Sequence, residues 1–188
     1  KSESIDSQEV IWMFSLNKVA LNVTLFHSEW SDQITLSNVT IFKNQGNNSS
    51  KGVEMSIDWH TAKNLFVSAN TTYTDSKNKS KMYSYTAFPD WMVNLSVKYL
   101  LPEYDLIIKL NNQLKFGLND NVHSQRPNNH RLDNYIRTDV YVGWAARNNV
   151  DIWFKAINVF DKNNRVANSF SAEFGTEEMP FSLGAGIN

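Results

Sequence analysis

The chain has 188 residues and a formal net charge of −1, with 41% hydrophobic, 13% aromatic and 20% charged residues. This composition excludes a disordered, collagen-like or low-complexity chain, and the scattered lysines and arginines argue against a nucleic-acid partner. The absence of cysteine excludes disulfides and cysteine-bound zinc. No apolar run approaches the roughly 18 to 20 residues of a membrane-spanning helix. A membrane-spanning sheet stays open, because its signal is alternation.

Apolar and polar residues alternate along most of the chain, whereas the spacing of an amphipathic helix is nowhere sustained. The alternation is clearest where Trp91, Val93 and Leu95 face away from Asn94 and Ser96. In chain order, the predicted strands are residues 9–16, 19–31, 53–59, 65–75, 91–99, 104–111, 136–144, 150–159 and 181–187. The sequence therefore predicts an all-β antiparallel fold of about nine strands, several longer than the roughly five to six residues usual in soluble proteins.

Short and long connections alternate between these strands. The predicted short connections are residues 17–18, 60–64, 101–103 and 146–149, and the long ones are about 32–38, 76–86, 117–134 and 161–179. Adjacent antiparallel strands place every second connection on the same rim of a sheet. One rim then has only short turns and the other only long loops, an asymmetry that is typical of outer-membrane β-barrels.

The two faces of the predicted strands differ in chemistry. The charged residues of the clearest strands all fall on the polar face: Glu54, Asp58, Lys98, Asp105, Lys109, Arg137 and Asp139. The apolar face carries rings near strand ends: Trp59, Tyr73, Trp91, Tyr99, Tyr104, Trp144 and Phe181. Such rings suit the boundary between hydrocarbon and lipid headgroups. A secreted β-sandwich, for instance a carbohydrate-binding module, is an alternative in which the same rings cap a core.

Several short motifs follow one another in the order seen in a known family. They are Leu25-Phe26, Asp32-Gln33-Ile34, Lys51-Gly52-Val53-Glu54, Tyr73-Thr74-Asp75, Phe88-Pro89, Asp139 with Tyr141, Asn158-Val159-Phe160-Asp161-Lys162 and Pro180-Phe181-Ser182-Leu183-Gly184. In these motifs the chain resembles the C-terminal part of the barrel of TonB-dependent outer-membrane receptors, over nearly all of residues 1–188. The resemblance implies an antiparallel transmembrane β-barrel segment, about nine strands of a barrel of about 22.

The resemblance also implies a function. Receptors of this family sit in the bacterial outer membrane and import a scarce ligand, such as a ferric siderophore, haem or cobalamin, without altering it. The implied partners are outer-membrane lipid, the small-molecule ligand, the remaining barrel strands, a plug domain and the TonB protein. The plug, the TonB-contacting segment and the earlier strands are expected outside this chain. The seven charged residues of the polar face would then point to the lumen and the plug.

Two local features also carry expectations. Gly52 is expected to mark a bend or a close approach within a long strand. Phe160 is expected at the outer aromatic girdle, and Asp161 is expected to turn the chain into the last external loop.

The sequence contains no motif of an enzyme or a metal site. The four histidines lack metal-binding spacing, and no nucleophile elbow or phosphate-binding glycine loop occurs, so we expect no catalytic residue, metal or cofactor. His123, Arg126, His130 and Arg131 lie in the long connection 117–134 and are candidate contacts to a metal chelate or anionic ligand. The alternative for them is an ordinary solvated loop. The remaining alternative for the whole chain is a small barrel that closes within about nine or ten strands.

Overall fold

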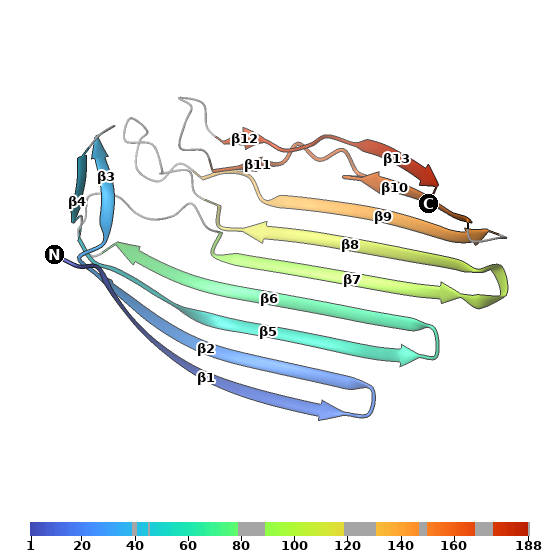
Figure 1. Ribbon diagram of the computed structural model, residues 1–188, viewed down its shortest axis with the longest axis horizontal. Helices are drawn as coiled ribbons and strands as arrows, with labels where there is room; N and C mark the ends of the chain where they lie inside the picture. The colour runs from blue at the N-terminus through green and yellow to red at the C-terminus, as the bar shows by residue number, and fades with distance from the viewer. Residues whose placement is uncertain are drawn as a thin grey trace.

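The computed structural model describes residues 1–38, 41–44, 46–78, 89–118, 131–146, 150–167 and 175–187. Nine strands in this part of the chain form one antiparallel sheet, in the order β1-β2-β5-β6-β7-β8-β9-β10-β13 (Figure 1). Their bounds are β1 Ser4–Leu16, β2 Val19–Ser31, β5 Asn48–Ala62, β6 Leu65–Asn78, β7 Trp91–Leu101, β8 Leu106–Phe116, β9 Tyr135–Ala146, β10 Val150–Ile157 and β13 Ser182–Ile187. The predicted all-β antiparallel fold is confirmed.

The connections between these strands follow the predicted alternation. The short connections are residues 17–18, 63–64, 102–105 and 147–149, and the long ones are 32–47, 79–90, 117–134 and 158–181. The short turns lie at one end of the sheet and the long connections at the other (Figure 1). Two of the long connections contain small two-stranded sheets that the alternation did not predict. These are β3 (Ile34–Asn38) with β4 (Ile41–Asn44), and β11 (Arg165–Val166) with β12 (Thr176–Glu177).

The strand register gathers apolar side chains on one face of the sheet. Leu25, Val53, Tyr73, Trp91 and Phe116 are successive partners across five neighbouring strands. Direct cross-strand partners point to the same face, so these residues form a continuous apolar row. The rings of Tyr73 and Trp91 are in contact, with centroids 4.8 Å apart. This row lies on the side of the long connections.

Aromatic residues also mark the other end of the apolar face. Trp59, Tyr99 and Trp144 lie near the ends of β5, β7 and β9, on the side of the short turns, and each is at least 42% exposed. Rings therefore lie at both ends of the apolar face, as the alternation predicted. Their spacing along β7, from Trp91 to Tyr99, matches the roughly nine to eleven residues that a tilted strand needs to cross a bilayer.

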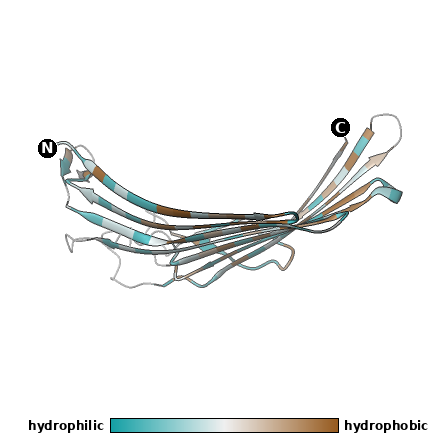
Figure 2. Ribbon diagram, turned by 90° about the horizontal axis from the view of Figure 1, so that it is seen from below, coloured by the Kyte–Doolittle hydropathy of each residue, from teal (hydrophilic) through white to brown (hydrophobic). Residues whose placement is uncertain are grey.

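The sheet is a single open layer (Figure 2). Among the described residues only two hydrophobic side chains are buried, Leu118 and Tyr135, whereas a sandwich of this size would bury a whole face. Strands β1 and β13 form the two opposite edges and do not pair with each other. The architecture therefore differs from both alternatives, the β-sandwich and the small self-contained barrel.

The prediction was wrong at one short turn. Tyr104 and Asp105 were expected at the start of a strand, but Pro102–Tyr104 forms a single 3₁₀ turn and β8 begins only at Leu106. Proline has no N–H to continue a strand ladder, and its fixed φ favours such a turn. Asp105 then adopts a left-handed conformation with φ of 52°, and its N–H donates to the carbonyl of Pro102 at 3.3 Å. Asp105 is therefore not on the polar face of a strand.

Gly52 lies at a close approach, as expected from its position before Val53. It pairs with Phe26 on β2 and Thr74 on β6. A Cβ atom added at Gly52 would lie 2.6 Å from the Phe26 ring and would also collide with the backbone carbonyl of Tyr73. The ring of Phe26 thus covers the glycine on the polar face, an arrangement in which an aromatic side chain shields a glycine on the neighbouring strand.

Candidate functional site

The polar face of the sheet carries a row of polar side chains that crosses six strands, with hydrogen bonds between two pairs of its members. The row runs through Asn22, Ser56, Asn70, Asn94, Gln113 and Arg137. Asn22 Nδ2 donates to Ser56 Oγ at 3.2 Å, and Asn94 Nδ2 donates to Asn70 Oδ1 at 2.9 Å. A shallow open depression of about 350 Å³ lies over the middle of this row. Amide and hydroxyl groups, which are suited to neutral hydrogen bonding, form most of its polar lining, and the Arg137–Asp139 pair lines it as well.

Six of the seven charged residues predicted for the polar face do share one face of the sheet. The register places Asp58 and Asp139 in one cross-strand row, Lys98 and Lys109 in the next, and Arg137 in the amide row. Glu54 lies one row further toward the long connections, in register with Thr24 and Thr72. Asp105 is the exception, because it belongs to the turn described above.

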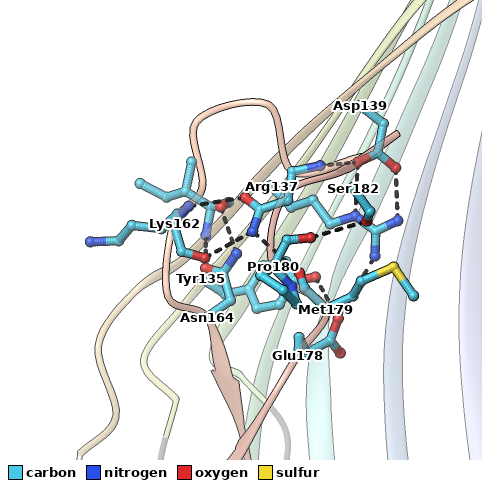
Figure 3. A network of polar contacts seen from close by, with 11 residues as sticks. Tyr135, Arg137, Asp139, Lys162, Asn164, Glu178, Met179, Pro180 and Ser182 are labelled. Atoms are coloured by element: carbon cyan, nitrogen blue, oxygen red, sulfur yellow. Dashed lines mark hydrogen bonds and ion pairs between the residues drawn. The ribbon is translucent and has the colours of Figure 1, made fainter. Parts of the chain in front are cut away.

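Arg137 is the centre of an ionic cluster at the long-connection end of the polar face (Figure 3). Its Nε and Nη2 donate to the two carboxylate oxygens of Asp139 at 2.9 and 2.8 Å, a bidentate pair. Its Nη1 lies 3.7 Å from Glu178 Oε2, which also accepts a hydrogen bond from the buried Tyr135 hydroxyl at 3.0 Å. One guanidinium therefore joins strand β9 to the long connection 158–181. Bidentate pairs of this kind are among the stronger hydrogen bonds in proteins.

Asn158 fixes the start of the same long connection. It is 1% exposed and adopts a left-handed conformation with φ of 51°, which asparagine tolerates better than most residues. Its Nδ2 donates to the carbonyls of Lys162 and Met179 at 3.0 and 3.3 Å, and its Oδ1 accepts from the Lys162 N–H at 3.1 Å. Its own N–H donates to Asp139 Oδ1 at 3.0 Å. One side chain thus joins both ends of this connection.

Two further residues of this connection replace strand pairing with side-chain contacts. Asn164, 3% exposed, accepts from the Ile136 N–H at 2.9 Å and donates to the Ile136 carbonyl at 2.8 Å, as a neighbouring strand would. Asp161 adopts φ of 46°, and its Oδ1 accepts from the Phe181 N–H at 2.9 Å just before β13 begins. Asp161 therefore lies in a turn, as predicted, while Phe160 beside it is 75% exposed.

We expect Asn158→Ala to lower the free energy of unfolding of the protein by about 2 to 3 kcal/mol. The change removes three side-chain hydrogen bonds of about 0.5 kcal/mol each, the low end of their usual range, and strains alanine in a left-handed conformation by about 1 kcal/mol. Asn158→Gly is the matched control, because glycine removes the same bonds without that strain. Urea unfolding in detergent measures both. Equal losses for alanine and glycine would show that the conformation contributes nothing, and wild-type stability of both variants would contradict the role of the hydrogen bonds.

The last two long connections contact each other at their bases. The Leu132 N–H donates to the Leu118 carbonyl at 2.9 Å, which closes the connection 117–134 near the sheet. The Leu132 side chain lies beside Gly175, where an added Cβ would be 3.2 Å from Leu132 Cδ2. At the other end of β12, Arg165 Nη2 donates to Glu177 Oε1 at 2.7 Å, and this hydrogen bond lowers the pKa of the Glu177 carboxyl. The connections 117–134 and 158–181 are therefore in contact close to the sheet, through Leu132 and Gly175.

The candidate ligand contacts of the long connection are described only in part. Arg131 is exposed and lies at the base of the connection, next to Leu132. His123, Arg126 and His130 lie outside the described residues. Within the described ranges no three His, Cys, Asp or Glu side chains gather as metal ligands. In the same ranges, no helix is long and apolar enough to cross a membrane.

The alternation did not predict the cluster around Arg137 and Asn158. Period-two patterning places Arg137 and Asp139 on the same face, but it carries no information about Glu178, Asn158 or Asn164, which reach β9 from a loop. The only local signal is the run of Asn and Asp between residues 158 and 164, which is typical of turns.

Comparison with known proteins identifies one family and a set of similar structures. The family described as "TonB dependent receptor-like, beta-barrel" matches residues 1–159. A search of curated protein sequences found no match. The ferric-catecholate import receptor Fiu from E. coli K12 is similar with a TM-score of 0.79 at 15% identity, over 97% of this chain and 27% of that chain.

Two other solved structures agree with the first. The ferric yersiniabactin uptake receptor FyuA from Yersinia pestis has a TM-score of 0.75 at 20% identity, over 98% of this chain and 29% of that chain. The FrpB iron transporter from Neisseria meningitidis has a TM-score of 0.75 at 14% identity, over 100% of this chain and 31% of that chain. At such identities the likeness shows the fold alone. This chain spans less than a third of the length of each of these structures.

Proposed function

Because this chain belongs to the TonB-dependent receptor β-barrel family, which matches it over residues 1–159, we propose that it forms the C-terminal wall of a bacterial outer-membrane import receptor. The family is one of transport receptors, not enzymes. The observation that supports the proposal best is the two-faced single layer, with rings at both ends of its apolar face and all long connections at one rim. This is the arrangement expected of strands that separate lipid from a polar lumen.

In this proposal each face has a separate role. The apolar face contacts acyl chains, and the amide row and charged residues of the opposite face line the lumen, where a plug domain packs. The edges of β1 and β13 pair with strands outside this chain, in a barrel of about 22 strands. An unpaired backbone group in lipid costs several kcal/mol, so neither edge is stable against acyl chains.

The ligand class that we propose is a ferric siderophore. The support comes from similar structures, which include receptors named for ferric catecholates and ferric yersiniabactin. The long connections would capture the chelate, with His123, Arg126, His130 and Arg131 as contacts to its anionic groups. TonB would act through a part of the receptor outside this chain and displace the plug.

Uptake of radioactive iron tests this function directly. The full-length receptor is expressed in cells that lack their other siderophore receptors, and a labelled ferric catecholate is supplied. We expect uptake above that of receptor-free cells, and its loss when TonB is deleted or the proton gradient is dissipated. Uptake that persists without TonB would contradict the proposed mechanism. No uptake of catecholate, hydroxamate or mixed-type chelates would contradict the ligand class.

The four proposed ligand contacts in the connection 117–134 have a separate test. Replacing His123, Arg126, His130 and Arg131 together with alanine is expected to raise the half-saturating ligand concentration about tenfold or more, the equivalent of one charged hydrogen bond. The control is Lys51→Ala, which removes an exposed charge from β5. Unchanged uptake in the fourfold variant would show that this connection is only a solvated loop.

A further inference from the structure

Three lysines form one cross-strand row on the polar face, on the side of the short turns. Lys98 on β7 pairs directly with Lys109 on β8, Lys109 pairs with Tyr141 on β9, and Tyr141 pairs with Lys155 on β10. We call Lys98, Lys109 and Lys155 the basic row. With strands about 4.8 Å apart, the three ammonium groups occupy a band about 15 Å wide. Like charges on directly opposite residues destabilise a sheet, so this arrangement calls for a compensating group.

Aromatic rings supply part of that compensation. Lys98 Nζ lies 4.3 Å from the centroid of Phe66, and Lys109 Nζ lies 5.2 Å from the centroid of Tyr141. None of the ion pairs among the described residues includes a lysine of the basic row. Asp139, which interacts electrostatically with Lys155, already holds Arg137 with both of its oxygens.

The wall beside the basic row is flat. Trp153 on β10 is the direct partner of Gly143 on β9 and Gly186 on β13, on the same face as Lys155. A Cβ atom added at Gly186 would lie 2.6 Å from the Trp153 ring, and one at Gly184 would lie 3.5 Å from it. The indole therefore lies against the glycines instead of projecting from the sheet. This leaves room for another protein surface to approach the lysines closely.

Enclosing the basic row in a lumen makes ammonium groups without counter-charges unfavourable. In the proposed receptor the polar face surrounds a lumen filled by a plug, which removes much of the water around the basic row. Each buried ammonium loses several kcal/mol of hydration. A cation–π contact returns only about 2 kcal/mol even when desolvated. Rings alone therefore do not compensate for the enclosed lysines, and carboxylates have to come from the protein that fills the lumen.

We propose that the basic row is the docking site for an acidic patch on the plug domain. The patch would present on the order of three carboxylates, one for each lysine, and would rest on the flat surface beside Trp153. The contact lies at the rim opposite to the ligand-capturing connections, so it anchors the plug without occupying the ligand site. This inference rests on the proposed function, because it requires a plug in the lumen.

Carbodiimide cross-linking of the full-length receptor in native outer membranes tests the docking. The reagent joins a carboxylate and a lysine amine through an amide bond with no spacer, so it reports groups in ionic contact. Mass spectrometry of the digested receptor should find Lys98, Lys109 or Lys155 joined to aspartate or glutamate of the plug. Lys51 and Asp75, 3.9 Å apart on β5 and β6, provide an internal positive control. The Lys51–Asp75 cross-link without any between the basic row and the plug would overturn the proposal.

Substitution provides a second measurement. A protease should cleave the plug at lower urea concentrations in the triple variant Lys98→Gln, Lys109→Gln, Lys155→Gln than in the wild type. The triple lysine-to-arginine variant should retain the plug, because arginine keeps the charge. Equal release in both variants would also overturn the proposal. If the glutamine variant fails to form a barrel, the cross-linking of the wild-type receptor decides alone.

The two proposals fail in different ways. Cross-linking needs neither ligand nor TonB. Plug cross-links in a receptor that imports nothing would contradict only the proposed function. Import by a receptor without those cross-links would contradict only the docking site.

Discussion

Replacing Arg137 with methionine is expected to lower the free energy of unfolding of the full-length receptor by about 3 kcal/mol. This is the low end of the cost of removing one partner from a buried ion pair, because Arg137 and Asp139 are only partly buried. Methionine keeps most of the apolar stem but leaves the carboxylates of Asp139 and Glu178 without their shared cation. Two like charges then remain close together. Urea unfolding in detergent, followed by tryptophan fluorescence, measures the loss.

Two controls separate charge from packing in this prediction. The double variant Arg137→Met, Asp139→Asn removes one of the stranded charges and should recover part of the lost stability. Lys51→Met removes an exposed ion pair with Asp75 and should cost less than about 1 kcal/mol. A loss in Arg137→Met no larger than that in Lys51→Met would show that the cluster contributes little to holding the connection 158–181 against β9.

Adding a single methyl group at Gly52 is expected to cost about 3 kcal/mol or more, the upper end of overpacking effects. The methyl would collide with the Phe26 ring and the backbone carbonyl of Tyr73, and a carbonyl inside a ladder cannot move without shifting a strand. The first measurement is the urea concentration at which half of the Gly52→Ala receptor is unfolded. The second is the fraction of receptor that stays folded in unheated detergent, as seen on a gel.

Gly184→Ala is the matched control for this change. Its added methyl would lie 3.5 Å from the Trp153 ring, an ordinary contact distance, so the free energy of unfolding should change by less than about 1 kcal/mol. The variant Gly52→Ala, Phe26→Leu removes the collision with the ring and keeps the collision with the carbonyl. Full recovery in that variant would mean that the backbone of β6 yields easily, and equal midpoints for Gly52→Ala and Gly184→Ala would contradict the close approach.

The fold was predictable because its main signal is local. A strand exposed to two different environments must alternate, so residues 91–99 alone give both faces of β7. The strand ends were less predictable. β5 was expected from Val53 but begins at Asn48, because Asn48 to Lys51 pair with β2 and β6 through the backbone ladder and carry no apolar alternation. The turn at Pro102 was predicted, but its end was placed at Glu103 instead of Asp105, since Tyr104 and Leu106 continue the alternation beyond it.

The candidate site was predictable only where it lies on strands. The common face of Glu54, Asp58, Lys98, Lys109, Arg137 and Asp139 follows from a period of two and the register. The contacts between β9 and the connection 158–181 do not follow from the period or the register. Tyr135 and Glu178 are 43 residues apart in the sequence and meet only when the chain returns to the sheet. Lys155 was also missed, since the weak alternation of residues 150–159 concealed its alignment with Lys98 and Lys109.

The strand order has a kinetic consequence. Every pairing in the nine-stranded sheet joins a strand to the next one of that sheet along the chain, and four of the eight links are short turns. Such a meander has a low contact order for a β-structure, so little loop-closure entropy opposes any single step. Assembly can therefore advance by adding one hairpin at a time to a growing template. The slow event in such a pathway is the meeting of strands far apart in the sequence, which in this wall can occur only at the outer edges of β1 and β13.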